Sequence, residues 1–203
     1  MNKIYSNRKA ENINHALYIC PDCYEIDSFE VKNNDFVCSS CNYDIHINQF
    51  GFFERIKKGK LYFNNIRDWY NWEEEWLLKN ITDKYDKKYN KVIFEDKNSK
   101  IFHSKTNSDL LNIGYADVKL YIDKIELDFT DRNQLITLNF NDLQTINPQI
   151  NERLEIYYNN EAYRIIGSRP GVSALKWEVA LNAIWKKLGQ NNKLSSYIHP
   201  NIK

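Results

Sequence analysis

Four cysteines, arranged as two C-x-x-C pairs near the N-terminus, most strongly limit the folds open to this chain of 203 residues. The pairs are Cys20 with Cys23 and Cys38 with Cys41, and 14 residues separate them. Each C-x-x-C makes a tight turn that directs two thiolates at one cation, and two such turns complete a tetrahedral site of four sulfurs. The spacing therefore predicts a zinc ribbon that binds one structural Zn²⁺ per chain.

Other uses of the cysteines remain open at this level. Iron in a rubredoxin-type site needs the same spacing, so the residues do not separate it from zinc. A redox dithiol is disfavoured because no βαβ pattern flanks the pairs, and two disulfides are disfavoured in a chain without a secretory leader. His46 is close in sequence, but four thiolates already saturate a zinc ion. We therefore expect His46 to be an ordinary strand residue that faces solvent.

Short alternating segments predict the remainder of the ribbon. Residues 26–31 and 35–37 are predicted to form two strands joined by an Asn-Asn turn, and residues 43–48 a third strand. Residues 1–53 are therefore expected to form the zinc ribbon together with an N-terminal arm.

Residues 54–90 are predicted to contain a Trp-rich helix and a linker. Trp69, Trp72 and Trp76 share one helical face, and the helix is expected to open near residue 65 or 68. A Trp stripe can anchor a helix at a membrane interface or cage a ligand, whereas the ordinary interpretation is packing on the next domain. Residues 79–90, rich in Lys and Asp, are predicted to be a linker or exposed turn, with anionic-lipid contact as the alternative.

The rest of the chain has an all-β pattern that is closed by one helix. Strands are predicted at 92–95, 100–103, 114–122, 125–129, 135–140, 143–146, 153–158 and 162–166. The helix that follows has Ser173 as its expected N-cap, Trp177 and Leu181 on its core stripe, and Gly189 as its stop. Residues 91–190 are therefore predicted to form an antiparallel barrel or sandwich of the PH-like kind, capped by a C-terminal α-helix. Residues 191–203 are expected to be a polar, frayed tail.

Composition limits the classes of function. A net charge of +1 disfavours a general nucleic-acid binder, and the stretch between Cys20 and Cys41 has Lys32 as its only basic residue. A nucleic-acid-binding or protein-interacting zinc ribbon remains the alternative, because aromatic residues after the second cysteine pair could stack on bases. No signal peptide or long apolar run is present, so we expect a cytoplasmic protein, with peripheral contact at the inner face of the membrane left open.

No catalytic constellation is recognisable in the sequence. Motifs of α/β-hydrolases, P-loop ATPases, zinc proteases and dinucleotide enzymes are absent. The four histidines are scattered outside known motifs: His15, His46, His103 and His199. With every cysteine assigned to a metal, no thiol nucleophile remains, and the sequence predicts no catalytic residue.

Residues 8–23, RKAENINHALYICPDC, resemble the segment that follows the catalytic domain in 1-acyl-sn-glycerol-3-phosphate (lysophospholipid) acyltransferases of low-GC Gram-positive bacteria, the Firmicutes. The similarity continues through residues 38–41, 51–53 and 65–72, and it covers roughly residues 8–77. The catalytic H-x4-D motif and the phosphate-binding E-G-T-R motif of that family are absent from this chain. The resemblance thus implies a C-terminal accessory part that lacks the catalytic domain, and no catalytic residue carries over.

Together these observations predict a non-catalytic accessory module for phospholipid biosynthesis. Its expected partners are an acyltransferase catalytic domain or another protein, and an anionic membrane lipid. Six basic residues are candidate anion contacts: Lys57, Lys58, Lys60, Arg164, Arg169 and Lys176. For Arg164 and Lys176 the ordinary interpretation is an exposed place on a strand or a helix.

Overall fold

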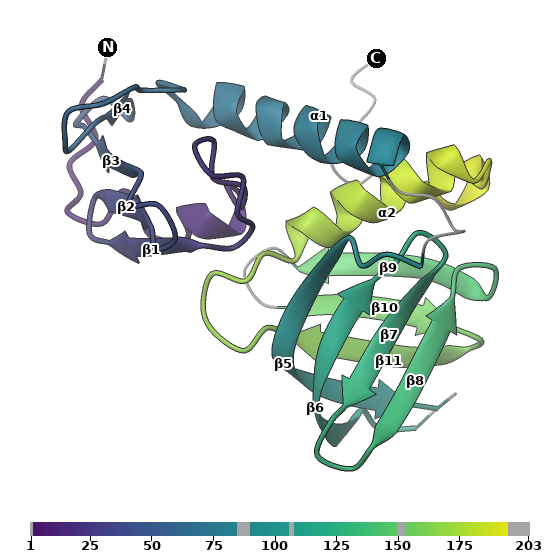
Figure 1. The fold of residues 1–203 in the computed structure, drawn as a ribbon. Helices are drawn as coiled ribbons and strands as arrows, with labels where there is room; N and C mark the ends of the chain where they lie inside the picture. The colour runs from purple at the N-terminus through teal and green to yellow at the C-terminus, as the bar shows by residue number, and fades with distance from the viewer. Residues whose placement is uncertain (1, 85–89, 106–107, 150–152, 195–203) are drawn as a thin grey trace. The chain divides into compact units, whose positions relative to one another are not determined.

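The computed structural model describes residues 2–84, 90–105, 108–149 and 153–194. The chain divides into two compact units, one formed by the residues up to Trp76 together with Gly171–Ser173, the other by Leu77–Pro170 together with the residues from Ala174. The first unit is a ribbon, and the second is a curled antiparallel sheet with a C-terminal helix (Figure 1). The predicted fold class, mainly β with few helices, is confirmed.

The ribbon contains a four-stranded antiparallel sheet in which the strands pair in chain order. Its strands are β1 (Phe29–Lys32), β2 (Asp35–Cys38), β3 (Asp44–Ile47) and β4 (Phe53–Glu54). A short 3-10 helix, η1 (Ile13–His15), precedes them. Asn33 begins the turn between β1 and β2 with φ 57°, a left-handed conformation that Asn tolerates better than most residues. The three predicted ribbon strands are present, and β4 is an addition that the alternation pattern did not indicate.

Helix α1 (Ile66–Lys84) supplies the centre of the ribbon's own core. Asn65 caps the helix, because its Oδ1 accepts the backbone N–H of Asp68 at 3.0 Å. Trp69 is fully buried. Five aromatic rings have centroids 5.4–6.0 Å from that of Trp69: Phe29, Phe36, Tyr43, Phe53 and Phe63. The Trp stripe therefore begins inside the ribbon, and the expectation that it packs on the next domain is wrong for Trp69.

The same helix corrects the predicted linker. It continues to Lys84, so residues 79–84 are helical and not an exposed turn. Residues 85–89 of the predicted linker lie outside the described residues. In the parts of the chain that are described, neither α-helix combines the length and hydropathy that a bilayer-spanning segment needs.

The second unit is a seven-stranded antiparallel sheet in the order β8-β7-β6-β5-β11-β10-β9. A four-stranded meander and a three-stranded meander join where β5 pairs with β11, and the sheet curls into a half-barrel (Figure 1). Its strands are β5 (Phe94–Ser104), β6 (Leu111–Leu120), β7 (Lys124–Phe129), β8 (Gln134–Asn139), β9 (Leu143–Gln149), β10 (Arg153–Tyr158) and β11 (Glu161–Ile166). The predicted strand at 100–103 lies within β5, and the one predicted at 92–95 overlaps its start, which is at Phe94. The two are thus one strand, irregular between Asp96 and Ser99.

Helix α2 (Leu175–Lys187) follows the last strand and packs against β9. Trp177 and Leu181 are buried, as the predicted core stripe requires. Gly189 has φ 73° and ends the helix in a Schellman motif, with Gln190 N–H donating to Trp185 O at 2.8 Å. The predicted N-cap is wrong: Ala174 is the capping residue, and no side chain caps the helix. Of the predicted tail, Asn191–Lys193 forms the 3-10 helix η3, and residues 195–203 lie outside the described residues.

Candidate metal centre

The structure brings the four predicted cysteine ligands together. Their Sγ atoms all lie within 4.8 Å of one another. Cys20 Sγ is 3.6 Å from Cys41 Sγ, and Cys23 Sγ is 3.7 Å from Cys38 Sγ. A tetrahedron of sulfurs about 2.3 Å from a central zinc has edges of about 3.8 Å, whereas a disulfide needs about 2.05 Å. The four residues therefore fit one tetrahedral ion, and all four thiols are free of disulfides.

Both C-x-x-C turns have the same backbone geometry. In the first, Tyr24 has φ 63° and donates its N–H to Cys20 O at 2.9 Å; in the second, Asn42 has φ 62° and donates to Cys38 O at 2.9 Å. The N–H of the first cysteine donates in turn to the carbonyl two residues past the second cysteine, at 3.0 and 2.8 Å. Two equivalent knuckles face each other, which is the arrangement that directs two pairs of thiolates at one cation.

Short β pairings hold each knuckle closed at its base. An isolated bridge pairs Ile19 with Ile26 around the first knuckle. The ladder between β2 and β3 pairs Val37 with Asp44 around the second. In both cases the residue before the first cysteine pairs with the third residue after the second cysteine. Backbone pairings therefore hold both knuckles, the first through an isolated bridge and the second through the sheet.

Hydrogen bonds to sulfur favour the thiolate at one of the ligands. Burial raises the pKa of Cys38, but the Ser28 hydroxyl, 3.2 Å from Sγ, and the backbone N–H groups of Cys41 and Ser40 outweigh burial and lower this pKa to about 7. Burial raises the pKa of Cys20, while two backbone N–H groups of its own knuckle act in the opposite direction. Burial also raises the pKa of Cys41, to about 11. A metal binds the thiolate form, so donors to sulfur favour metal binding.

Helix α1 fixes the backbone that leads into the first ligand. Glu73 is fully buried, and its Oε2 accepts the N–H groups of Tyr18 at 3.0 Å and Ile19 at 3.1 Å. The indole Nε1 of Trp69 donates to Ile19 O at 3.0 Å. Burial raises the pKa of Glu73 well above its usual range, against the opposing effect of the two backbone donors. Sequence reasoning missed this role of Glu73, because the residue lies in a run of three glutamates that resembles an exposed helix face.

The other two residues of the Trp stripe lie beside the first knuckle. The ring of Trp76 stacks on Tyr24 at 5.7 Å with an interplanar angle of 13°, and the ring centroid of Trp72 lies 6.1 Å from that of Tyr24. The stripe thus contacts the ribbon along its length within the first unit. His46 lies elsewhere, on β3, where its Nδ1 pairs with Asp35 Oδ1 at 2.7 Å and its side chain is 42% exposed. This placement agrees with the expectation of an ordinary strand residue.

Three of the predicted anion contacts share one loop, between β4 and α1. Lys57, Lys58 and Lys60 are all exposed there. The Lys57 side chain is 68% exposed and its Nζ lies 3.8 Å from Asp44 Oδ2. Lys60 Nζ lies 4.2 Å from the ring centroid of Tyr62. The three lysines therefore lie on one exposed loop.

The structure does not assemble the other three. Arg164 on β11 pairs with Glu155 at 2.7 Å, and Arg169 is exposed in the segment before α2. Lys176 is fully buried in α2, where its Nζ donates to Asp96 Oδ1 at 2.5 Å. Both sequence interpretations placed Lys176 at the surface, and both are wrong on that point. Sequence reasoning did not foresee its partner because Asp96 lies 80 residues away along the chain.

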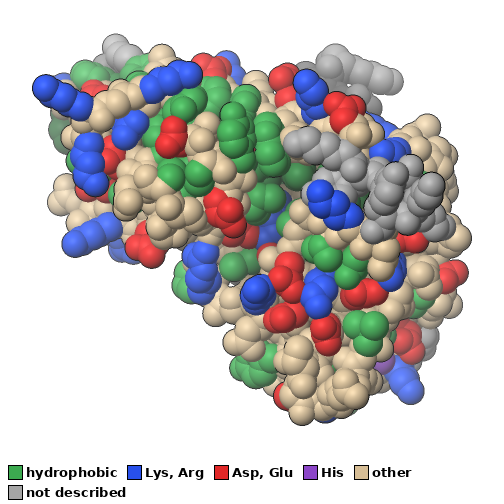
Figure 2. Space-filling model, viewed as in Figure 1, with side chains coloured by type: hydrophobic (Ala, Val, Ile, Leu, Met, Phe, Trp, Pro, Cys, Tyr) green, Lys and Arg blue, Asp and Glu red, His purple; other side chains and the backbone are tan. Residues whose placement is uncertain are grey.

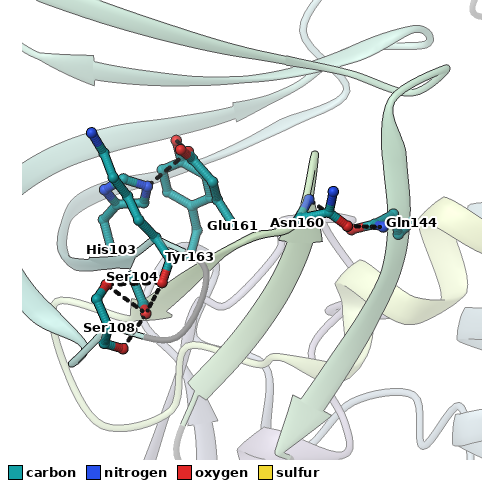
Figure 3. Close-up of polar contacts among 8 residues, drawn as sticks. His103, Ser104, Ser108, Gln144, Asn160, Glu161 and Tyr163 are labelled. Carbon is teal, nitrogen blue, oxygen red and sulfur yellow. Dashed lines mark hydrogen bonds and ion pairs between the residues drawn. The ribbon is translucent and has the colours of Figure 1, made fainter.

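A second polar cluster lies at the ends of β5 and β11 (Figure 3). His103 Nε2 lies 2.9 Å from Glu161 Oε2, and the Tyr163 hydroxyl donates to the same oxygen at 3.3 Å. The rings of His103 and Tyr163 stack at 4.6 Å. The hydrogen bond from His103 lowers the pKa of Glu161. Ser104 donates to Ser108 O at 2.7 Å and to Lys105 O at 3.0 Å, and both acceptors belong to the loop that follows β5.

Comparison with known proteins gives structural neighbours only. No protein-family model matches the chain, and no curated protein matches it. The Vps36 N-terminal PH domain is 17% identical over 49% of this chain and 82% of that domain, with a TM-score of 0.38. An inhibited Vav1 structure is 12% identical over 59% of this chain and 37% of the Vav1 chain, with a TM-score of 0.35. The PH-like assignment of the second unit itself follows from its strand order and its C-terminal helix.

Proposed function

We propose that this chain is a non-catalytic docking module whose ribbon is held together by one Zn²⁺. The observation that carries the proposal is the cluster of four sulfurs at the spacing of a tetrahedral ion. Four thiolates fill the coordination sphere of zinc and leave no position for a substrate or an activated water. When bound, the ion supplies a cross-link between the two knuckles. Cys20, Cys23, Cys38 and Cys41 would hold it.

Elemental analysis of the purified chain identifies the bound metal and its stoichiometry. We expect about one zinc per chain, and loss of the ribbon's folding when a strong chelator removes it, because binding free energy of a structural zinc is folding free energy. If the chain instead contained one iron and showed a rubredoxin-like visible spectrum, the metal of the site would be iron and not zinc. A chain that contains no metal and keeps its circular dichroism in chelator would overturn the proposal.

The resemblance over residues 8–77 supports a finer proposal about the partner. In it, the module serves the catalytic domain of a 1-acylglycerol-3-phosphate acyltransferase, to which it docks in the cytoplasm. Light scattering after gel filtration should then show a complex between this chain and such a catalytic domain. The chain alone should transfer no acyl group from acyl-CoA or acyl-carrier protein to lysophosphatidate. Acyl transfer by the isolated chain, or the absence of any complex, would contradict this partner.

Lipid is the second docking target that we propose, at the inner face of the membrane. Three exposed lysines on one loop support an anionic surface as the target. Nucleic acid is the alternative, and the acidic composition of the stretch from Cys20 to Cys41 disfavours it, since phosphate is repelled by Asp and Glu. Salt-dependent binding of single-stranded DNA at the same protein concentration that leaves anionic vesicles unbound would favour the alternative.

A further inference from the structure

The loop of residues 55–61 combines cations with exposed aliphatic side chains. Ile56 is 48% exposed and Leu61 is 37% exposed. Between them the three lysines at 57, 58 and 60 are exposed. In Figure 2, Lys and Arg side chains gather over the part of the ribbon unit that carries β4 in Figure 1. We call residues 55–61 the basic loop.

A buried carboxylate holds the basic loop in shape from inside the ribbon. Asp44 on β3 is 1% exposed. Its Oδ1 accepts the backbone N–H groups of Ile56 at 3.2 Å and Lys57 at 3.1 Å, and the side-chain Nε of Arg55 at 3.1 Å. Burial raises the pKa of Asp44, but the Lys57 N–H, Arg55 and the Ile56 N–H outweigh it and lower this pKa, so the carboxylate is charged at neutral pH.

Arg55 closes the loop from the other side. Its Nη1 donates to Lys60 O at 2.7 Å, and its guanidinium carbon lies 4.6 Å from the ring centroid of Tyr43. The two ends of the loop are therefore tied to one arginine, which is itself tied to Asp44. A loop that is ordered before binding loses little conformational entropy when it binds. These contacts direct the charge of Arg55 inward, whereas Lys57, Lys58 and Lys60 stay exposed to solvent, even though Lys57 lies within ion-pair distance of Asp44 and Lys60 lies over the Tyr62 ring.

The chemistry of the exposed side chains indicates the partner. Lysines near an anionic bilayer gain from its surface potential, and aliphatic side chains gain when they enter the boundary between headgroups and acyl chains. An acidic protein or a nucleic acid would satisfy the lysines but leave Ile56 and Leu61 in water. A bilayer satisfies both groups at once, because its anionic surface lies directly over its apolar interior.

We propose that the basic loop is an interfacial anchor that binds anionic phospholipid bilayers and inserts Ile56 and Leu61 below the headgroups. The inference rests on the proposed docking function and assigns its lipid contact to the ribbon unit. The candidate cations of the second unit take no part in this anchor.

The charge requirement is tested by sedimentation with vesicles of equimolar phosphatidylcholine and phosphatidylglycerol. Changing Lys57, Lys58 and Lys60 together to Gln should weaken partitioning by roughly 100-fold, because each lysine near the surface contributes about five-fold. Raising the salt concentration should weaken the binding of the unchanged chain in the same direction. Vesicles of phosphatidylcholine alone should bind weakly.

A matched variant removes the same net charge from other places. Lys3, Lys32 and Lys79 are exposed outside the basic loop, and their combined change to Gln should weaken partitioning by less than about five-fold. Equal losses in the two triple variants would overturn the anchor and leave general electrostatic attraction. Metal content and circular dichroism of both variants should equal those of the unchanged chain, so that misfolding is recognised.

Insertion is tested separately from charge. In an Ile56→Trp variant, lipids brominated in their acyl chains should quench the additional emission, and the emission should shift to the blue. A Leu135→Trp variant, at a position 55% exposed in the second unit, should show neither effect. Ile56→Asn should weaken partitioning several-fold without any change of charge.

Two results would overturn the inference while leaving the docking function intact. One is vesicle binding that neither the lysine variant nor Ile56→Asn weakens, which would place the lipid contact elsewhere. The other is equal binding to soluble polyglutamate with no quenching in the Ile56→Trp variant, which would indicate an acidic protein as the partner. Absence of vesicle binding together with a normal zinc content would also overturn the proposed lipid contact, and it would leave the proposal of a zinc-bound ribbon intact.

Discussion

Glu73, Asp44 and Lys176 are among the charged side chains that are fully or almost fully buried, and each has specific partners. Glu73 accepts two backbone N–H groups, and Asp44 accepts two backbone N–H groups and Arg55. Lys176 pairs with Asp96, whose other oxygen accepts the indole N–H of Trp177 at 2.8 Å. A buried charge without such partners would cost several kcal/mol. None of these partnerships was visible in the sequence, because all of them join residues that are far apart along the chain.

Replacement of Glu73 should separate its hydrogen bonding from its charge. Glu73→Leu removes the acceptor of two buried backbone N–H groups and should lower the free energy of unfolding by about 2–4 kcal/mol. Glu73→Gln keeps an acceptor oxygen and removes the ionisation, so at pH 7 it should cost less than about 1 kcal/mol or stabilise. Urea unfolding of the three proteins at pH 7 measures both values. Equal losses for Leu and Gln would contradict the role assigned to the acceptor.

The raised pKa of Glu73 also predicts a pH dependence. Between the usual pKa and the raised one, the unfolded chain loses the proton while the folded chain keeps it. The unfolded state then binds fewer protons, so stability falls as the pH rises through this window. Glu73→Gln should remove this part of the dependence in urea unfolding from pH 4.5 upward. An unchanged slope in the Gln variant would show that the carboxyl ionises normally.

The buried ion pair of the second unit predicts a coupled double variant. Lys176→Met leaves the Asp96 carboxylate unpaired and should cost about 3–5 kcal/mol. Adding Asp96→Asn removes the uncompensated charge while an amide oxygen remains for Trp177, so the double variant should recover at least about half of that loss. Thermal or urea unfolding measures the cycle. Additive losses would mean that the two side chains do not interact.

At the scale of elements, alternation and periodicity predicted most strands and both helices. Inward-facing residues such as Ile125, Leu127 and Phe129 alternate in β7, and Trp177 and Leu181 recur in α2 at helical spacing. The wrong predictions concern segments where the local sequence preference for a linker or a helix cap differs from what packing in the folded chain requires. A polar stretch rich in Lys and Asp continues α1 where a linker was predicted, and Ser173 donates to His15 O at 2.6 Å in place of capping α2.

The metal centre shows the same difference between residues that local sequence predicts and residues that only the fold brings together. The four ligands could be read from the sequence, because the C-x-x-C spacing alone sets the geometry of each knuckle. The groups that support them could not: Ser28 reaches Cys38 across a β pairing, and Glu73 reaches Ile19 over 54 residues. The three lysines of the basic loop were recognised as candidates. Their pre-organisation by Asp44 was not, because Asp44 is separated from the loop by the turn before β4.

The cap of α1 gives a prediction at this scale. Asn65→Ala removes the acceptor for the Asp68 N–H and should lower the free energy of unfolding by about 1 kcal/mol. Asn71→Ala is the matched control, since Asn71 is exposed inside the same helix and Ala favours helix there. It should leave stability unchanged or raise it slightly. Equal effects of the two changes would argue against a capping role for Asn65.

At the scale of the whole molecule, each unit has its own core but a different means of stabilising it. The second unit buries the inner face of a curled sheet under α2. The first unit has short strands, and its core is the aromatic cluster around Trp69 together with the four sulfurs. Small domains with limited cores commonly depend on a metal or on disulfides. We therefore expect the metal to stabilise the first unit selectively.

Chelation should accordingly unfold the two units unequally. Removal of the metal should abolish protection of backbone amides in β1–β3 from hydrogen exchange, while β5–β7 keep theirs. Cys38→Ser should act in the same way without chelator. Simultaneous loss of protection in both units would contradict a separately stabilised ribbon.

X-ray absorption at the zinc edge of the purified chain tests the central claim most directly. The account predicts a single shell of four sulfurs at about 2.3 Å, with no oxygen or nitrogen neighbour. A shell with fewer sulfurs, or one that includes water, histidine or carboxylate, would describe an open site and would contradict the assignment of this ribbon as a scaffold.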